Sequence, residues 1–151
     1  MTSKEKVLQR ERQRGYEAAK QVQSSAEYMT GTELYAAEDR LPSFAAACRR
    51  KNMLDRPIGF VCKSSAGRVV RLLQPYDSDV YTAEPEELSA QWGFKWSTDP
   101  ADALPFLALS TSPYNIGECC SENSKVYRSA ISSNVWAPSA YPQGWEEVQF
   151  T

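Results

Sequence analysis

The chain has 151 residues, of which 42% are hydrophobic and 24% are charged, a size that suits one ordinary domain or two very small modules with an extension. It contains no histidine, which excludes Ser-His-Asp and Cys-His catalysis, metal sites with histidine ligands and imidazole pH switches. Its formal net charge of −2 differs from the basic footprint of a nucleic-acid-binding surface, so no nucleic-acid partner is expected.

Membrane and export signals are not expected either. The longest apolar run, residues 103–109, contains a proline and is far shorter than the roughly 20 residues that a membrane helix needs. Lys4, Glu5 and Lys6 near the N-terminus are followed by no apolar segment, so we expect no secretory signal and no membrane insertion. The sequence favours a protein kept in a reducing cytoplasm, or packed into a particle that is assembled there.

The composition changes near residue 56. All four tryptophans, eight of the nine prolines and five of the seven glycines follow this point, and the formal charge is +2 for residues 1–55 and −4 for residues 56–151. Helix-forming residues before it and turn residues after it predict the α+β class. We expect a helical arm at 1–55 for anchoring or oligomerisation, a first β module at 56–96, a short helical linker at 97–112 and a second β module at 113–151.

The arm begins with a very polar segment, residues 3–24, which contains no proline and predicts a long helix. A residue with a small or apolar side chain recurs every seven positions, at Leu8, Gly15, Val22 and Met29, as in a weak coiled-coil seam. A lone helix this polar is marginal in water. Two interpretations remain open: a solvated helix lying on its own domain, or a helix docked on another subunit.

Two shorter helices are predicted after it. Thr30 and Glu33 have the spacing of a capping box, which marks a helix start. Residues 43–48 form a second short helix with Pro42 near its first turn, where the missing N–H costs nothing. The basic residues 49–51 then suit a helix C-terminus, against the alternative of a ligand site.

An internal repeat occupies the second region. Residues 58–62 and 116–120 both read I-G-x-x-C, and each is followed by a polar turn and a small-basic-Val-x-Arg segment at 67–71 and 124–128. Each copy predicts a β-hairpin, with strands at 59–62 and 68–73 in the first and at 117–120 and 125–130 in the second. A later strand closes each unit with Trp92 or Trp145, which we expect in the core because two strands alone bury too little apolar area.

The second copy resembles carbohydrate-binding modules of the family 5/12, chitin-binding type. The residues that carry the resemblance are Tyr114, Gly117, Lys125, Tyr127, Pro138, Pro142, Gly144, Trp145 and Glu146, with a weaker match at Gly59, Gly67, Val69, Val70 and Trp92 in the first copy. Residues 114–147 are also similar to the C-terminal module of short tail or fibre proteins of bacteriophages that infect Gram-positive bacteria, in which two such modules often follow one another. The resemblance implies a phage particle protein that holds sugars.

The sequence departs from this pattern at one place. Chitin-binding members carry adjacent exposed tryptophans after the second tyrosine, whereas residues 128–132 here read R-S-A-I-S. The usual stacking platform is therefore absent, and the fold can be kept without chitin affinity.

Aromatic side chains on polar loops are the candidates for binding sugars, because flat rings stack on sugar C–H faces while amides and carboxylates bind hydroxyls. The candidate residues are Trp136, Tyr141, Asn134 and Gln143 in the second module and Tyr76 and Tyr81 in the first. The alternative is that these side chains pack into the module core or against a neighbouring subunit.

Other chemistry-bearing residues indicate no catalysis. The carboxylate pairs 86–87 and 146–147 are adjacent in sequence and point apart, so we interpret them as solvated surface and not as a glycosidase pair. Cys48, Cys62 and the adjacent Cys119 and Cys120 contain no C-x-x-C pair, so we expect buried or unpaired thiols, with a metal site as the weaker alternative. No cofactor is expected.

Between the modules, residues 98–104 predict a single helical turn, and Phe106, Leu107 and Leu109 indicate that the modules pack together. We interpret the chain as a non-enzymatic bacteriophage virion component, assembled in the host cytoplasm. Its helices would contact other virion proteins and its modules host cell-surface glycans. The alternatives are a connector or decoration protein that binds no sugar, and the wall-targeting part of a lytic enzyme. The heptad pattern favours a homo-oligomer, although trimer, dimer and monomer stay open.

Overall fold

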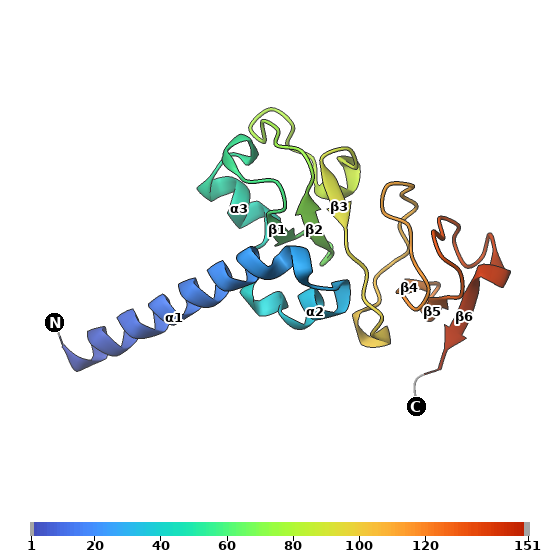
Figure 1. Cartoon of the computed structure of the whole chain (residues 1–151), viewed down its shortest axis with the longest axis horizontal. Coiled ribbons are helices and arrows are strands. Elements are labelled where there is room, and N and C mark those ends of the chain that lie inside the picture. The colour runs from blue at the N-terminus through green and yellow to red at the C-terminus, as the bar shows by residue number, and fades with distance from the viewer. Residues whose placement is uncertain (1, 150–151) are drawn as a thin grey trace.

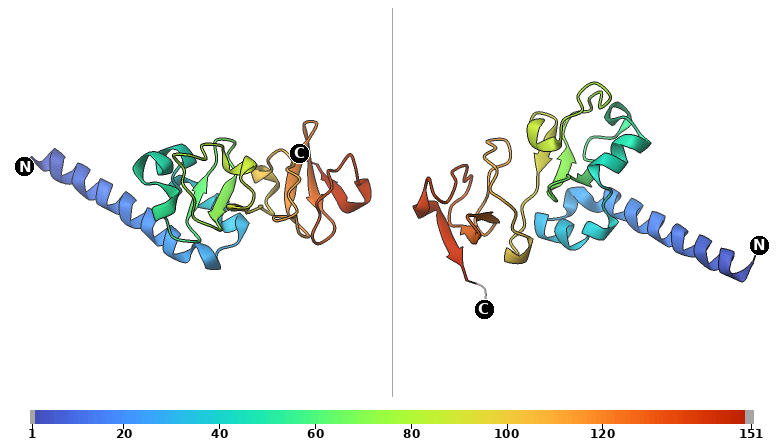
Figure 2. Two further views of the ribbon diagram at one scale, coloured as in Figure 1. Left: turned by 90° about the horizontal axis from the view of Figure 1, so that it is seen from above. Right: turned by 180° about the vertical axis from the view of Figure 1, so that it is seen from behind.

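The computed structural model describes residues 2–149 and has the predicted α+β architecture: an N-terminal helical part followed by two three-stranded antiparallel sheets (Figure 1). The helices are α1 (Ser3–Ser25), α2 (Gly31–Ala36) and α3 (Phe44–Arg50). The first sheet contains β1 (Val61–Lys63), β2 (Val69–Leu72) and β3 (Trp92–Phe94), and the second contains β4 (Cys119–Glu122), β5 (Lys125–Ser129) and β6 (Trp145–Val148). The start of α1 and the second sheet lie at opposite ends of an elongated molecule (Figures 1 and 2).

Helix α1 is exposed over most of its length and is held only at its C-terminal end. Residues 3–17 are all exposed, whereas Val22 is buried. The Gln23 side chain binds the backbone of the edge strand β1: its Nε2 donates to the Val61 oxygen at 2.6 Å and its Oε1 accepts from the Val61 N–H at 2.9 Å. The arm therefore projects away from the domain on which its last turns pack.

Capping interactions fix the helix starts. The Thr30–Glu33 capping box is confirmed, with both reciprocal hydrogen bonds at 3.1 Å. An equivalent box at Thr2 and Glu5, which we did not predict, starts α1. Helix α3 begins after Ser43, whose hydroxyl accepts from Ala46, so Pro42 precedes the cap instead of occupying the first turn.

The first sheet is buried on both faces. Cys62, Val70 and Leu72 pack into the main core, which contains Phe44 of α3 and Trp92 of β3. Their strand neighbours Val61 and Val69 point to the opposite face and pack with Val22, Leu34 and Tyr35 of the helical part. Trp92 is fully buried, as predicted. Helices thus cover a sheet too small to be stable alone.

The two repeats share one hydrogen-bonding pattern. Gly59 and Gly117 both have left-handed backbones, with φ of 94° and 91°, which explains the glycine of the I-G-x-x-C motif. The Gly59 N–H donates to Leu72 at 2.8 Å, and the Gly117 N–H donates to Ser129 at 2.9 Å. In each unit a one-turn 3₁₀ helix beginning with proline, at Pro85–Glu87 or Pro142–Gly144, precedes the closing strand.

A column of aromatic rings joins the two sheets. Trp96, which follows β3, stacks on Tyr114, which precedes β4, with ring centroids 4.3 Å apart. Phe106 of the connecting segment stacks on the same tyrosine at 5.5 Å, and Trp145 of β6 meets both Phe106 and Tyr114 edge to face. The predicted contact between the modules therefore exists, and its centre is a ring pair that the sequence did not single out. The predicted helical turn shortens to Pro100–Asp102.

Removing the Trp96 ring tests this column. Trp96 is 5% exposed, so Trp96→Ala should lower the free energy of unfolding by about 3–5 kcal/mol, because the cavity adds to the lost apolar contact. Trp136→Ala is the matched control, since Trp136 is 50% exposed, and it should lower the free energy of unfolding by only about 1 kcal/mol. Urea unfolding followed by circular dichroism measures both, and equal losses would contradict the column's role.

The repeated glycine gives a second prediction. Gly117→Ala should lower stability by about 1–2 kcal/mol, because an L-residue is strained at this φ. Gly15→Ala is the control within the chain: nothing lies within 4 Å of the added Cβ, and alanine should favour α1 by about 1 kcal/mol. Opposite signs are expected in thermal melts of the two variants; the same sign would refute the backbone argument.

Candidate functional site

The connection between β5 and β6 carries an exposed aromatic pair. Trp136 is 50% exposed and Tyr141 is 39% exposed, and their ring centroids lie 5.6 Å apart with planes tilted by 58°. This connection lies at the end of the molecule farthest from the start of α1 (Figure 1). Gln143, in the 3₁₀ helix Pro142–Gly144 that ends the connection, is also exposed. Three of the predicted binding residues therefore share one accessible loop.

Asn134 lies beneath the Trp136–Tyr141 loop, in the interior of the module, and is not exposed to solvent. It is fully buried: its Nδ2 donates to Ser129 and Gly144, and its Oδ1 accepts from the Trp136 N–H at 3.2 Å. The prediction that Asn134 binds a ligand is wrong, because no donor or acceptor of its side chain reaches the surface. It acts as a positioning residue that fixes the backbone on which Trp136 stands.

Further contacts hold the two rings in place. The Trp145 Nε1 donates to the Trp136 oxygen at 2.7 Å, so the buried tryptophan positions the exposed one. A Cβ on Gly144 would lie 2.8 Å from the Tyr141 ring, which means that the ring lies directly over the glycine backbone. Glu122 accepts from the Ser139 N–H at 2.9 Å and ties the loop to β4. These supports were not predicted, although the Asn-x-Trp spacing at 134–136 is a signal for a local Asx turn.

The first module carries only one of its two predicted aromatics on the surface. Tyr76 is 6% exposed, and its hydroxyl accepts from the Trp92 Nε1 at 3.0 Å, so its prediction as a sugar contact is wrong: it satisfies the buried indole. Tyr81 is 59% exposed on the following loop. Asn52 donates to both Asp77 and Asp79 there and lowers the pKa of Asp77 below its usual range.

The carboxylate pairs form no facing couple. Glu146 and Glu147 are exposed neighbours on β6, paired in register with Arg128 and Tyr127. Glu87 is exposed, but Glu86 was wrongly expected on the solvated surface. Its side chain is 15% exposed and lies 3.6 Å from Arg68, a buried guanidinium. Adjacent acids on one strand do not line a cleft for glycoside hydrolysis.

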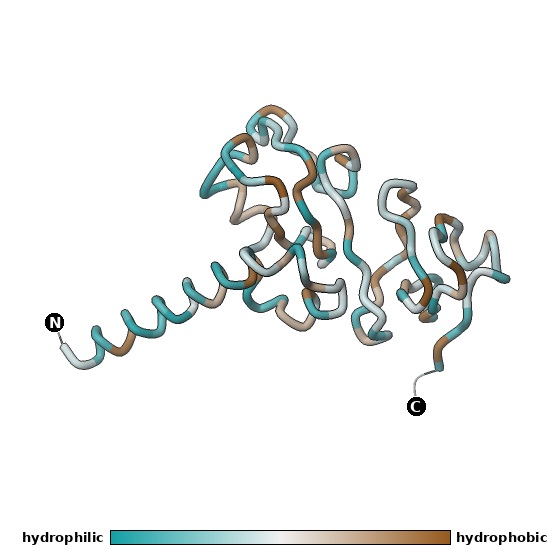
Figure 3. The backbone as a smooth tube through the Cα atoms, viewed as in Figure 1, coloured by the Kyte–Doolittle hydropathy of each residue, from teal (hydrophilic) through white to brown (hydrophobic). Residues whose placement is uncertain are grey.

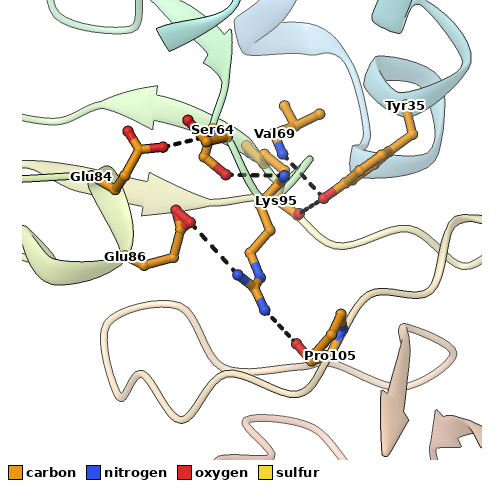
Figure 4. Close-up of polar contacts among 9 residues, drawn as sticks. Tyr35, Ser64, Val69, Glu84, Glu86, Lys95 and Pro105 are labelled. Atoms are coloured by element: carbon orange, nitrogen blue, oxygen red, sulfur yellow. Dashed lines mark hydrogen bonds and ion pairs between the residues drawn. The ribbon is translucent and has the colours of Figure 1, made fainter. Parts of the chain in front are cut away.

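A buried polar network centred on Arg68 lies at the junction of the modules, and its partners Glu86 and Pro105 are labelled in Figure 4. Its Nη2 donates to the Pro105 oxygen at 2.7 Å, while Ser64 accepts from its backbone N–H. Because the segment around Pro105 pairs with Ser121 of β4, Arg68 links the first sheet to the second. The network therefore locks the modules together and presents no open site.

Tyr35 lies in the same region and belongs to the packing of α2. Its hydroxyl donates to the Lys95 oxygen and accepts from the Val69 N–H, both at 3.1 Å (Figure 4). Burial raises the pKa of Tyr35 to about 12, because the phenolate would lose its hydration. The group is thus a structural donor and stays protonated at neutral pH.

Within residues 2–149 the four cysteines are free thiols, of which Cys62, Cys119 and Cys120 are buried and Cys48 is half-buried. Burial raises the pKa of Cys120 to about 12, which keeps this thiol protonated and unreactive. No cluster of three or more His, Cys, Asp or Glu side chains suited to a metal occurs in the same residues.

The raised tyrosine pKa predicts a loss of stability at high pH. Tyr35 ionises near 10.0 when unfolded and near 12 when folded, so stability is complete below pH 10 and decreases as the pH rises toward 12. Urea unfolding at increasing pH should show this decrease, and Tyr35→Phe should make it shallower although it lowers stability at neutral pH. An unchanged slope in Tyr35→Phe would contradict the assignment.

No helix within residues 2–149 combines the length and apolar character that crossing a membrane requires. Comparisons with protein-family models, with curated proteins and with solved structures find no match to this chain.

Proposed function

We propose that this protein is a non-enzymatic structural component of a bacteriophage particle, assembled in the host cytoplasm, which attaches by its helical arm and touches host-surface glycans with its distal module. The observation that carries the proposal is the separation of two exposed features at opposite ends of the molecule. Residues 3–17 of α1 are exposed at one end, and the Trp136–Tyr141 pair is exposed at the other. An adhesion protein needs this arrangement, with attachment and recognition kept apart.

The distal pair supports the sugar-binding half of the proposal. Its two rings present apolar surface beside the exposed amide of Gln143, the combination that stacks on sugar C–H groups and binds hydroxyls. Asn134 and Trp145 fix the loop from within, so binding requires little ordering of the site. Because these contacts fix the backbone at the exposed Trp136, we infer that its ring serves to bind a ligand and is not exposed by chance.

The arm supports the attachment half. A polar helix with fifteen exposed residues at 3–17 gains little from packing on its own domain over that length, so a partner is the expected source of its stability. Other particle proteins or further copies of this chain would supply that contact, and a homo-oligomer is part of the proposal.

A connector that binds no sugar is the second candidate. The observation that favours it is the sequence of residues 128–132, which contains no tryptophan. Chitin-binding modules of the type that this chain resembles carry adjacent tryptophans at this place. The aromatic surface is correspondingly small, and the distal pair would then contact a neighbouring subunit. Both candidate functions place the protein in a phage particle. They differ in whether a glycan or a neighbouring subunit covers Trp136 and Tyr141.

Glycan binding by the full chain tests the first candidate. On an array of bacterial surface glycans, Trp136→Ala and Tyr141→Ala should each weaken binding about tenfold, the usual cost of truncating a central aromatic contact. The control is Tyr28→Ala, which removes a tyrosine that is 82% exposed outside this loop and should bind as the wild type does. If the wild-type chain shows no saturable binding to any glycan, the adhesion part fails.

Phage that carry the same substitutions separate the candidates. Intact particles that no longer adsorb to cells would support adhesion, whereas failed assembly would support the connector. Antibody labelling of purified particles tests the shared part of the proposal, and particles without the chain would overturn both.

A further inference from the structure

A groove lined by basic side chains lies where α1 meets the first module. It consists of two adjacent hollows of about 640 Å³ and about 530 Å³. Four residues line both hollows and show that they are neighbours: Lys20, Gln23, Arg56 and Phe60. We call the two hollows together the basic groove. It is separate from the aromatic pair of the distal module.

Positive charge accumulates in the basic groove although the whole chain is acidic. The cationic side chains that line it are Lys20, Arg40, Arg50, Lys51, Arg56 and Arg71. Glu27 and Asp39 are the acidic ones. The ion pairs within residues 2–149 use Lys63, Arg68 and Lys125 instead, so none of the groove cations lies within 4.0 Å of a carboxylate oxygen of these residues.

Two arginines of the groove, Arg56 and Arg71, lack hydrogen-bond partners for part of their donors. The Arg56 guanidinium lies 4.4 Å from the centre of the Phe60 ring, and its Nη2 donates to the Ala47 oxygen at 2.9 Å. The Nε atoms of Arg56 and Arg71 are buried and have no hydrogen-bond partner. A buried donor without a partner is costly, and a carboxylate bound nearby would offset the charge of both groups.

The lining also has apolar side chains on its rim. Tyr16 is 62% exposed and Ile58 is 67% exposed, and the Phe60 ring lies between the hollows. A nucleic acid or polyphosphate offers no apolar side chains to this surface, and Glu27 and Asp39 would repel a uniform polyanion. Farther along α1 most residues are hydrophilic (Figure 3). The groove therefore suits a peptide that combines acidic and apolar residues.

We propose that the basic groove binds an acidic segment of a partner protein, in which carboxylates face the unpaired cations and apolar side chains cover Tyr16 and Ile58. This inference rests on the proposed function, since it names the chemistry of the partner at the base of the attachment arm. The binding mode is a peptide lying along a helix and a neighbouring loop, with charge setting the choice of partner.

A synthetic peptide of repeated Asp-Glu-Leu units, labelled with fluorescein, serves as the probe in an anisotropy titration with the full chain. We expect saturable binding that weakens as salt is added. Lys20→Glu combined with Lys51→Glu should weaken binding about tenfold, because two attractive charges become repulsive. Both lysines are exposed, and circular dichroism melting checks that the variant stays folded.

The matched control is Lys4→Glu combined with Lys6→Glu, which changes the net charge equally at the far end of α1 and should bind as the wild type does. Equal binding by the two double variants, or no binding by the wild type, would overturn the proposal. Displacement of the peptide by inorganic polyphosphate at a lower concentration than by unlabelled peptide would also overturn it. Because the titration uses neither particles nor glycans, its failure leaves the labelling and array results of the proposed function unaffected.

Discussion

The stack of Trp96 on Tyr114 is the contact on which the relation between the two modules depends. Each sheet has three short strands and buries too little apolar surface to be stable alone. The stacked rings, extended by Phe106 and Trp145, give both sheets one continuous core. The Tyr114 backbone also pairs with Asn134, so the same ring column supports the loop that carries the exposed aromatic pair.

Local signals predicted the elements well because they depend on neighbours in sequence. The capping residues at Thr30 and Glu33, the paired hairpins and the closing strands with Trp92 and Trp145 all follow from short-range spacing. The sequence did not predict Trp96 as the joint, since nothing in its neighbours distinguishes a tryptophan that packs across modules. Which aromatic side chain packs between the modules depends on contacts between residues far apart in sequence, and the spacing of residues in the sequence does not reveal those contacts.

Direction of side chains limited the prediction of the candidate site. Trp136, Tyr141, Gln143 and Tyr81 are exposed as binding residues must be, but Tyr76 and Asn134 turn inward. The Tyr76 hydroxyl and the Asn134 amide each form a hydrogen bond with another buried group. Those buried groups need a partner only once the fold has formed, so the sequence around Tyr76 and Asn134 does not reveal it. Glu86 also turns inward, where its carboxylate faces the charge of Arg68 at 3.6 Å. Polar surroundings in sequence therefore do not by themselves indicate exposure.

The contact between Gln23 and Val61 has a mechanical consequence. β1 is an edge strand, and its outward backbone groups are occupied by the Gln23 amide at Val61 and by Pro42, which accepts from the Lys63 N–H at 3.0 Å. A load that lifted the end of α1 would break the amide pair and open part of this edge. An open strand edge is a template for pairing with another chain. Gln23 thus joins two roles in one side chain, since it anchors α1 and covers part of the exposed edge of the first sheet.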